Sequence, residues 1–236
     1  MEHSFDSLHR FAPDARIVVT VPADSLEYAR ELFKESKAEV IVGGSSRQAS
    51  AYAAMQHLEE RQPRHVILHD AARPFLSHQI LHDTVEALKR HKAVDVAIKT
   101  SDTIIVECDG FVQSIPERNH LYRGQTPQGF CYRTLMLSYK KLGPDRLAEY
   151  TDDCGVFLAC HPTEKVRIVQ GNSENIKITD EIDLVRSGLE EVMCNAYCEI
   201  RDLYRRRRNI DTLRTAAYSL AIDKVARAYF QLGIFP

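Results

Sequence analysis

The first hundred residues alternate between short β-branched runs and stretches whose apolar residues have helical spacing. Predicted strands lie at residues 15–21, 39–42, 65–69 and 94–98, and predicted helices at residues 25–37, from Ser45 or Ser46 onward, and at 77–91. This order requires right-handed crossover connections and helices on both faces of one sheet. We therefore predict an α/β fold with a doubly wound, mostly parallel sheet.

Beyond residue 100 the pattern changes to a hairpin. Residues 103–108 and 111–115 are rich in β-branched residues and flank Asp109-Gly110. Asp-Gly between two such runs is a strong signal for a tight hairpin turn. A hairpin that projects from a doubly wound sheet needs a cover, and a partner subunit is one natural cover. We therefore expect a homodimer formed through this arm.

The last fifty residues form a different block. Apolar residues keep helical spacing from about Leu189 to Ile200 and again from Leu213 to Phe230. The sequence thus predicts a main domain at residues 1–186 and an appendage of two helices at residues 187–236.

Bulk composition excludes several classes of protein. The formal net charge of −2 gives no broad basic surface for nucleic acid, and no window approaches the ~20 apolar residues that span a bilayer. The first ten residues carry acids and histidines and do not resemble a secretory signal, and the six cysteines form no paired CxxC clusters. We expect a cytoplasmic protein with reduced thiols that binds neither nucleic acid nor membrane.

One predicted strand ends in chemically distinctive residues. The apolar run at residues 65–68 stops at His69-Asp70-Ala71-Ala72-Arg73-Pro74. Carboxyl ends of parallel strands are where open α/β sheets bind ligands. There Asp70 could hold a divalent metal, Arg73 could grip a phosphate, and Ala71 lets a ligand approach the backbone. An ordinary strand end with a surface ion pair is the alternative interpretation.

Three more polar clusters lie at other predicted strand ends or loops. They are Gly43 to Ser50; Arg118 with Gln125-Thr126-Pro127-Gln128; and Thr151-Asp152-Asp153 with Asn175 to Thr179, which includes Lys177. Plain turns, helix-capping loops and a solvated lysine would also explain them.

Together the clusters offer cations, hydroxyls, amides and a carboxylate, but no nucleophile–base pair. This set suits phosphoryl or nucleotidyl transfer, whereas hydride transfer would call for a G-x-G-x-x-G motif that this chain lacks.

The same pieces resemble a known family. Residues 1–186 are similar to the methylerythritol phosphate cytidylyltransferases of isoprenoid biosynthesis and to the ribitol-phosphate cytidylyltransferases. The matching pieces are Gly43-Gly44 with Arg47-Gln48 and Ser50, His69 to Pro74, Asp102-Thr103, Gln125 to Gln128, Thr151 to Asp153 and Asn175 to Thr179. The resemblance implies a nucleotide-diphospho-sugar transferase fold. The implied reaction transfers CMP from CTP to a sugar-alcohol phosphate and releases diphosphate.

The resemblance also implies roles for individual residues. Asp70 would hold Mg²⁺, and Asp70, Arg73 and Lys177 would be the catalytic residues. The cytidine nucleotide would be bound by Gly43, Gly44, Arg47, Ser50 and Ala71, and the sugar phosphate by Thr103, Arg118, Thr126 and Thr151. The Asp109-Gly110 hairpin matches the family's dimerisation arm, so Thr103, Arg118 and Thr126 are expected to serve the partner's site.

The chain departs from the family pattern in two places. The family's first strand and glycine-rich triphosphate loop have no counterpart in this sequence, which starts near the following helix. A catalytically impaired relative that serves as a nucleotide-binding, phosphate-binding or assembly module is therefore the alternative hypothesis. The last fifty residues resemble the carboxyl-terminal helices of glutamate dehydrogenases, a likeness from which we expect helical structure and no activity.

Overall fold

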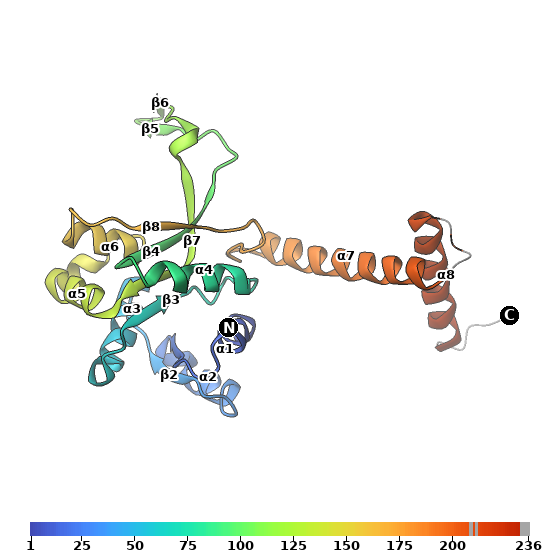
Figure 1. The fold of residues 1–236 in the computed structure, drawn as a ribbon, viewed down its shortest axis with the longest axis horizontal. Coiled ribbons are helices and arrows are strands. Elements are labelled where there is room, and N and C mark those ends of the chain that lie inside the picture. Colours follow the sequence, from blue (N-terminus) through green and yellow to red (C-terminus); the bar gives the residue numbers. More distant parts are fainter. Residues whose placement is uncertain (208–209, 211, 232–236) are drawn as a thin grey trace. The chain divides into compact units, whose positions relative to one another are not determined.

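A computed structural model describes residues 1–207, 210 and 212–231 (Figure 1). The chain divides into two compact units, one spanning Met1–Lys177 and one beginning at Ile178. The boundary expected from the sequence, between residues 186 and 187, stays a prediction. The end of the predicted appendage, residues 232–236, lies outside the described residues.

The first unit has the α/β class predicted from the alternating pattern. Its helices are α1 (Glu2–Phe11), α2 (Leu26–Leu32), α3 (Arg47–His57), α4 (His78–Leu88), α5 (Tyr132–Leu147) and α6 (Asp153–Cys160), with short 3-10 turns η1 (Ala23–Ser25), η2 (Glu59–Arg61) and η3 (Arg118–His120). Its strands are β1 (Val18–Val21), β2 (Glu39–Val42), β3 (His65–Leu68), β4 (Ala93–Lys99), β5 (Val106–Cys108), β6 (Phe111–Ser114), β7 (Tyr122–Cys131) and β8 (Arg167–Gln170). Ser46 and Ser77 cap α3 and α4 by accepting hydrogen bonds from the amides of Ala49 and Ile80.

One strand of the four-stranded sheet runs against the other three, and β1 and β2 form a separate sheet. β1 and β2 pair in parallel, and a four-stranded sheet has the order β3-β7-β4-β8. β4 is parallel to β8, while β7 runs antiparallel to both β3 and β4. The parallel directions of β3, β4 and β8 are those of the predicted doubly wound sheet.

The segment Gln125 to Gln128, expected at a strand end or loop, lies inside the central strand β7. Proline in a central strand usually argues against a strand, because it cannot donate to the ladder. Here the register between β4 and β7 shifts between Val94 and Val96, across the residues that flank Thr126 and Pro127. This irregularity accommodates the proline, so the sequence-based interpretation of the segment was wrong.

Two apolar clusters cover the two faces of the four-stranded sheet. One joins Phe130 of β7 with Leu135 and Tyr139 of α5 and Phe157 of α6. The other joins Val94 and Val96 of β4 with residues of α4, including Leu81 and Leu88. The core therefore fixes both the sheet and the polar residues at its strand ends.

The predicted arm is present as the β5–β6 hairpin, which projects from the sheet in Figure 1. Asp109 and Gly110 both have positive φ, as a tight two-residue hairpin turn requires. The arm carries large apolar side chains that are exposed, among them Phe111 at 78% and Ile115 at 61%. No part of the chain that the structure describes buries them.

The second unit contains α7 (Glu181–Arg206) and α8 (Leu213–Gln231), as the sequence predicts. Asp180 caps α7 by accepting a hydrogen bond from the Asp183 amide at 2.8 Å. An ion pair between Lys224 and Glu199 links the two helices at 2.5 Å. Among the described residues, no helix is both long enough and apolar enough to cross a membrane.

Candidate active site

Three basic side chains converge on the carboxylate of Asp70, at the end of β3. Arg47 Nε lies 3.0 Å from Asp70 Oδ1, and Lys177 Nζ lies 3.1 Å from Asp70 Oδ2. Arg73 Nε lies 3.8 Å from the same Oδ2 atom. Arg47 comes from the first turn of α3, Arg73 from the turn after β3 and Lys177 from the segment after β8. These four residues come from three of the four predicted clusters, and the remaining cluster contributes Thr126, whose hydroxyl accepts a hydrogen bond from the Asp70 amide at 3.0 Å.

Electrostatics keep the Asp70 carboxyl ionised. Burial favours its neutral form, but the guanidinium of Arg47 and the ammonium of Lys177 outweigh burial and hold the pKa of Asp70 below its usual range. Arg73 is buried, with 9% of its surface exposed, and burial lowers the pKa of its guanidinium. The cations in this region outnumber the carboxylates they meet, so the site is suited to an anionic ligand.

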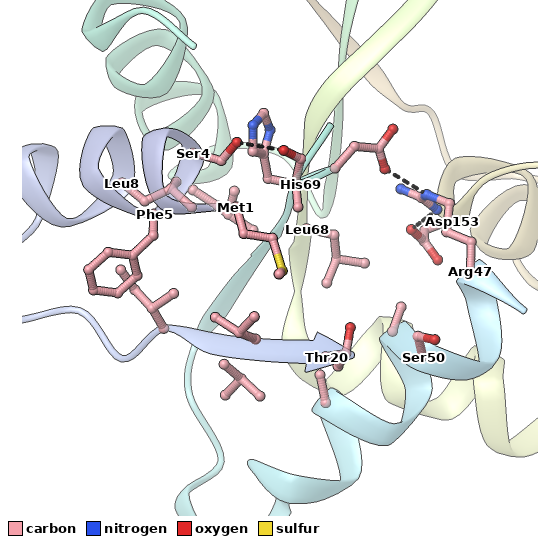
Figure 2. Close-up of a pocket in the computed structure, with 18 of the residues that line it drawn as sticks. Met1, Ser4, Phe5, Leu8, Thr20, Arg47, Ser50, Leu68, His69 and Asp153 are labelled. Atoms are coloured by element: carbon pink, nitrogen blue, oxygen red, sulfur yellow. Dashed lines mark hydrogen bonds and ion pairs between the residues drawn. The ribbon is translucent and has the colours of Figure 1, made fainter. Parts of the chain in front are cut away.

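Arg47 is held by a second carboxylate. Its Nη1 atom lies 2.5 Å from Oδ2 of Asp153, the first residue of α6 (Figure 2). Asp153 is fully buried and also accepts a hydrogen bond from the Tyr139 hydroxyl, and burial raises the pKa of this carboxyl. Sequence reasoning gave no role to Asp153 or Tyr139. The signal for Asp153 was its place in the Thr151-Asp152-Asp153 segment, which matches the family pattern, whereas Tyr139 had none.

Two cavities meet at Asp70 and Arg47. The first, of about 330 Å³, lies among α1, β1, β3 and α3 and is also lined by Ser50 and Ala71 (Figure 2). The second has a volume of about 290 Å³, and its lining includes Arg73, Thr126, Thr151, Gln128 and Lys177. Two ligands could therefore approach the same carboxylate and guanidinium from separate compartments.

The glycine pair packs against α3, and neither glycine lines the first cavity. A Cβ atom on Gly44 would collide with Ala49 of α3, and one on Gly43 would lie 2.7 Å from the Ser50 hydroxyl oxygen. The Gly44 amide donates to that hydroxyl at 3.0 Å. Close packing against α3 thus requires both glycines, and their predicted contact with a nucleotide stays a prediction.

Thr103 and Arg118 lie in the exposed segments that lead into and out of the arm. Arg118 donates from its guanidinium to the Ser101 carbonyl oxygen at 3.2 Å, and neither residue lines the two cavities. The single chain does not bring them to Asp70. Their role in a partner's site stays a prediction.

Asp70 fits the way proteins usually hold Mg²⁺. This ion is commonly bound by one or two carboxylates together with substrate phosphates, and Asp70 lines both cavities. A second group, Asp95, Asp152 and Cys154, also brings possible ligand atoms within 4.8 Å of one another. That group includes a buried thiol, a soft donor that suits Mg²⁺ poorly, and the Gln128 amide already donates to both carboxylates. The donor chemistry therefore favours Asp70.

Comparisons with known proteins agree with this geometry. A family model described as 2-C-methyl-D-erythritol 4-phosphate cytidylyltransferase (IspD) matches residues 1–190. Ribitol-5-phosphate cytidylyltransferase of Lactiplantibacillus plantarum is 32% identical, covering 78% of this chain and 84% of that protein. 2-C-Methyl-D-erythritol 4-phosphate cytidylyltransferase of Thermosipho africanus is 37% identical, covering 75% and 79%. The crystal structure of 4-diphosphocytidyl-2C-methyl-D-erythritol synthase from Anaerococcus prevotii superimposes with a TM-score of 0.73 at 28% identity, covering 81% and 88%.

Proposed function

The chain belongs to the IspD family of cytidylyltransferases, and we propose that it transfers a cytidylyl group from CTP to a sugar-alcohol phosphate. The observation that carries this proposal is the pair of cavities that share Asp70 and Arg47. Nucleotidyl transfer needs two phosphorylated molecules held in line at one positively charged position. The cytoplasmic location expected from the sequence stays a prediction.

In this proposal each cavity takes one substrate. The cytidine nucleotide occupies the first cavity, with contacts from Arg47, Ser50 and Ala71, which line it, and from the neighbouring Gly43 and Gly44. The sugar phosphate occupies the second cavity, with contacts from Thr126, Thr151, Arg73 and Lys177. A second copy of the chain adds Thr103 and Arg118 through the arm, whose exposed apolar side chains support a homodimer.

The proposed reaction is a direct displacement. An oxygen of the acceptor phosphate attacks the α-phosphorus of CTP, and the bond from that phosphorus to the diphosphate leaving group breaks. Arg47, Arg73 and Lys177 orient the phosphates and neutralise the charge that develops on their oxygens. Asp70 would hold Mg²⁺, which supplies further charge neutralisation when bound. No covalent intermediate with the protein is formed.

A turnover assay tests this function. The purified chain is incubated with CTP, Mg²⁺ and either methylerythritol 4-phosphate or ribitol 5-phosphate, and diphosphate release is measured. We expect release with one acceptor, matched by formation of the corresponding CDP-alcohol. Calorimetric binding of CTP without turnover on either acceptor would instead support the nucleotide-binding module and would overturn the proposed enzyme.

A further inference from the structure

We propose that the side-chain amides of Gln125 and Asn175 are positioning groups that hold the segment carrying Lys177 against β7 and so keep its ammonium at Asp70. The proposal rests on the function proposed above and adds two residues to which that function gives no role. Gln125 is 6% exposed and Asn175 is fully buried. Buried amides are hydrogen-bonded inside the protein, and their partners show what this pair holds together.

The segment that carries Lys177 has no regular structure of its own. Residues 171–177 follow β8 and form neither helix nor strand, so no ladder of backbone hydrogen bonds fixes them. Lysine has a flexible four-carbon stem. The place of its ammonium, 3.1 Å from Asp70 Oδ2, therefore depends on where the backbone beneath it is held.

The amide of Gln125 lies inside this segment and joins two points along it. Its Nε2 atom lies 2.8 Å from the Asn172 carbonyl oxygen and 3.2 Å from the Asn175 carbonyl oxygen. Carbonyl oxygens only accept, so Nε2 is the donor to both and Oε1 is left to accept. A Cβ atom on Gly171 would collide with that Oε1 atom, so the segment packs directly on the amide.

Asn175 ties the segment to β7 in the reverse direction. Its Nδ2 atom donates to the Thr126 carbonyl oxygen at 2.8 Å and to Gln125 Oε1 at 3.4 Å. Its backbone amide donates to Asn172 Oδ1 at 2.8 Å, which closes the turn at residues 172–175. The two side-chain amides thus bond each other, and each also bonds the backbone of the other's strand or segment.

The same anchor connects two of the proposed catalytic side chains. Arg73 Nη1 donates to the Asn175 carbonyl oxygen at 2.8 Å, two residues before Lys177. Arg73 and Lys177 both approach Oδ2 of Asp70, at 3.8 and 3.1 Å. A misplacement of about 1 Å at a reacting centre can cost roughly 100-fold in rate. The amide pair thus acts on the reaction through the position of Lys177.

A double-mutant cycle separates this role from direct contact with substrate, which is a real alternative because Gln125 lines the second cavity. Gln125→Met keeps the length, removes both donated hydrogen bonds and leaves the bond from Arg73 to the segment intact. We expect kcat/KM to fall between about 10- and 100-fold. Added to Lys177→Gln, the same change should cost less than about 3-fold more, because the ammonium it positions is already absent.

Asn175→Leu, of similar shape, should repeat this pattern in both backgrounds. Gln79→Met makes the matched change at an exposed position of α4 and should leave kcat/KM unchanged. An undiminished loss on adding Gln125→Met to Lys177→Gln would overturn the proposal, since Gln125 would then act by touching substrate or by general damage to the fold.

Hydrogen exchange of the full chain, followed by mass spectrometry, gives a readout that does not depend on turnover. In Gln125→Met we expect faster exchange of the amides at residues 172–177, while those of β4 and α4 keep their protection. Unchanged exchange at residues 172–177, or an equal increase throughout the sheet, would overturn the positioning role. The expected exchange pattern in a chain without turnover would support the amide pair and reject the enzyme.

Discussion

Two groups of carboxylates lie around the side-chain amide of Gln128, one at its oxygen and one at its nitrogen, and they differ in what surrounds them. Gln128 accepts from the Asp153 amide on one side, where Arg47 links Asp153 to Asp70. On the other side its amide nitrogen lies 2.9 Å from both Asp95 and Asp152. The first group meets three basic side chains. Among the described residues no ion pair joins Asp95 or Asp152 to a base.

The pKa values of Asp70 in the first group and Asp95 in the second are shifted in opposite directions. Burial acts on both groups, but Arg47 and Lys177 keep the pKa of Asp70 below its usual range. Burial, together with the nearby Asp152 carboxylate and despite the Gln128 amide, raises the pKa of Asp95 from 3.8 to about 6. The comparison teaches that acidic residues alone do not mark a phosphate site. The basic side chains around Asp70 distinguish it from Asp95, while Asp152 of the second group also lines the second cavity.

The two groups of carboxylates should differ most in their effect on catalytic activity. Asp70→Asn removes the proposed metal ligand and the charge that orients three cations, so we expect kcat/KM to fall about 1,000-fold. Asp95→Asn makes the same chemical change in the other group and should leave kcat/KM within about 3-fold. Diphosphate release with CTP and the preferred acceptor measures both. Comparable losses in the two variants would remove the distinction between the groups.

The second largest loss of activity is expected for a change at Lys177, because this residue supplies a charge to the first group only. Lys177→Gln keeps length and polarity but loses the ammonium, and we expect a loss in kcat of about 100-fold. Lys141→Gln, at an exposed position of α5, is the matched control and should be unchanged. Full activity of Lys177→Gln in the same assay would show that the lysine is a solvated surface residue.

Much of the fold could be predicted because its signals are local. Strands such as β2 and the caps of α3 and α4 follow from β-branched runs and serine positions that need no tertiary information. β7 could not be predicted, since its polar residues and proline resemble a loop. Only pairing with β3 and β4, both distant in sequence, makes that segment a central strand.

The site was predictable in outline for a different reason. Asp70, Arg47, Arg73 and Lys177 belong to motifs whose order matches a family, and the structure brings all four together. Some residues that hold these four side chains in place, such as Tyr139, belong to no such motif. Tyr139 lies in a helix with ordinary core spacing, and its bond to Asp153 depends on how α5 and α6 pack. Contacts of this kind exist only after the core has formed.

The second group should affect the free energy of unfolding rather than the catalytic activity. A pKa of about 6 instead of 3.8 means that the contribution of Asp95 to stability is lost as pH rises from about 4 to 6, because burial favours the neutral Asp95 carboxyl. Asp95→Asn is neutral at all pH values. We expect it to gain about 1–2 kcal/mol at pH 8, below the limit of about 3 kcal/mol set by the shift. Urea unfolding followed by circular dichroism should show the gain shrinking below pH 6; a gain that is independent of pH would contradict this origin.

The smallest expected effect separates the two roles of Asp152. Its Oδ1 atom caps α6 by accepting from the Gly155 amide at 2.8 Å, while its charge acts on Asp95. Asn is as good a helix cap as Asp. Asp152→Asn loses the attraction between the carboxylate and the dipole of α6, but it also removes the repulsion between this carboxylate and Asp95. We therefore expect the free energy of unfolding at pH 8 to change by less than about 0.5 kcal/mol. Asp152→Ala loses the cap and the hydrogen bond from Gln128, whose amide keeps Asp95 as an acceptor, and should cost about 1 kcal/mol. Equal stability of the two variants in the same urea experiment would mean that the cap contributes nothing and that the charge alone accounts for this residue's effect.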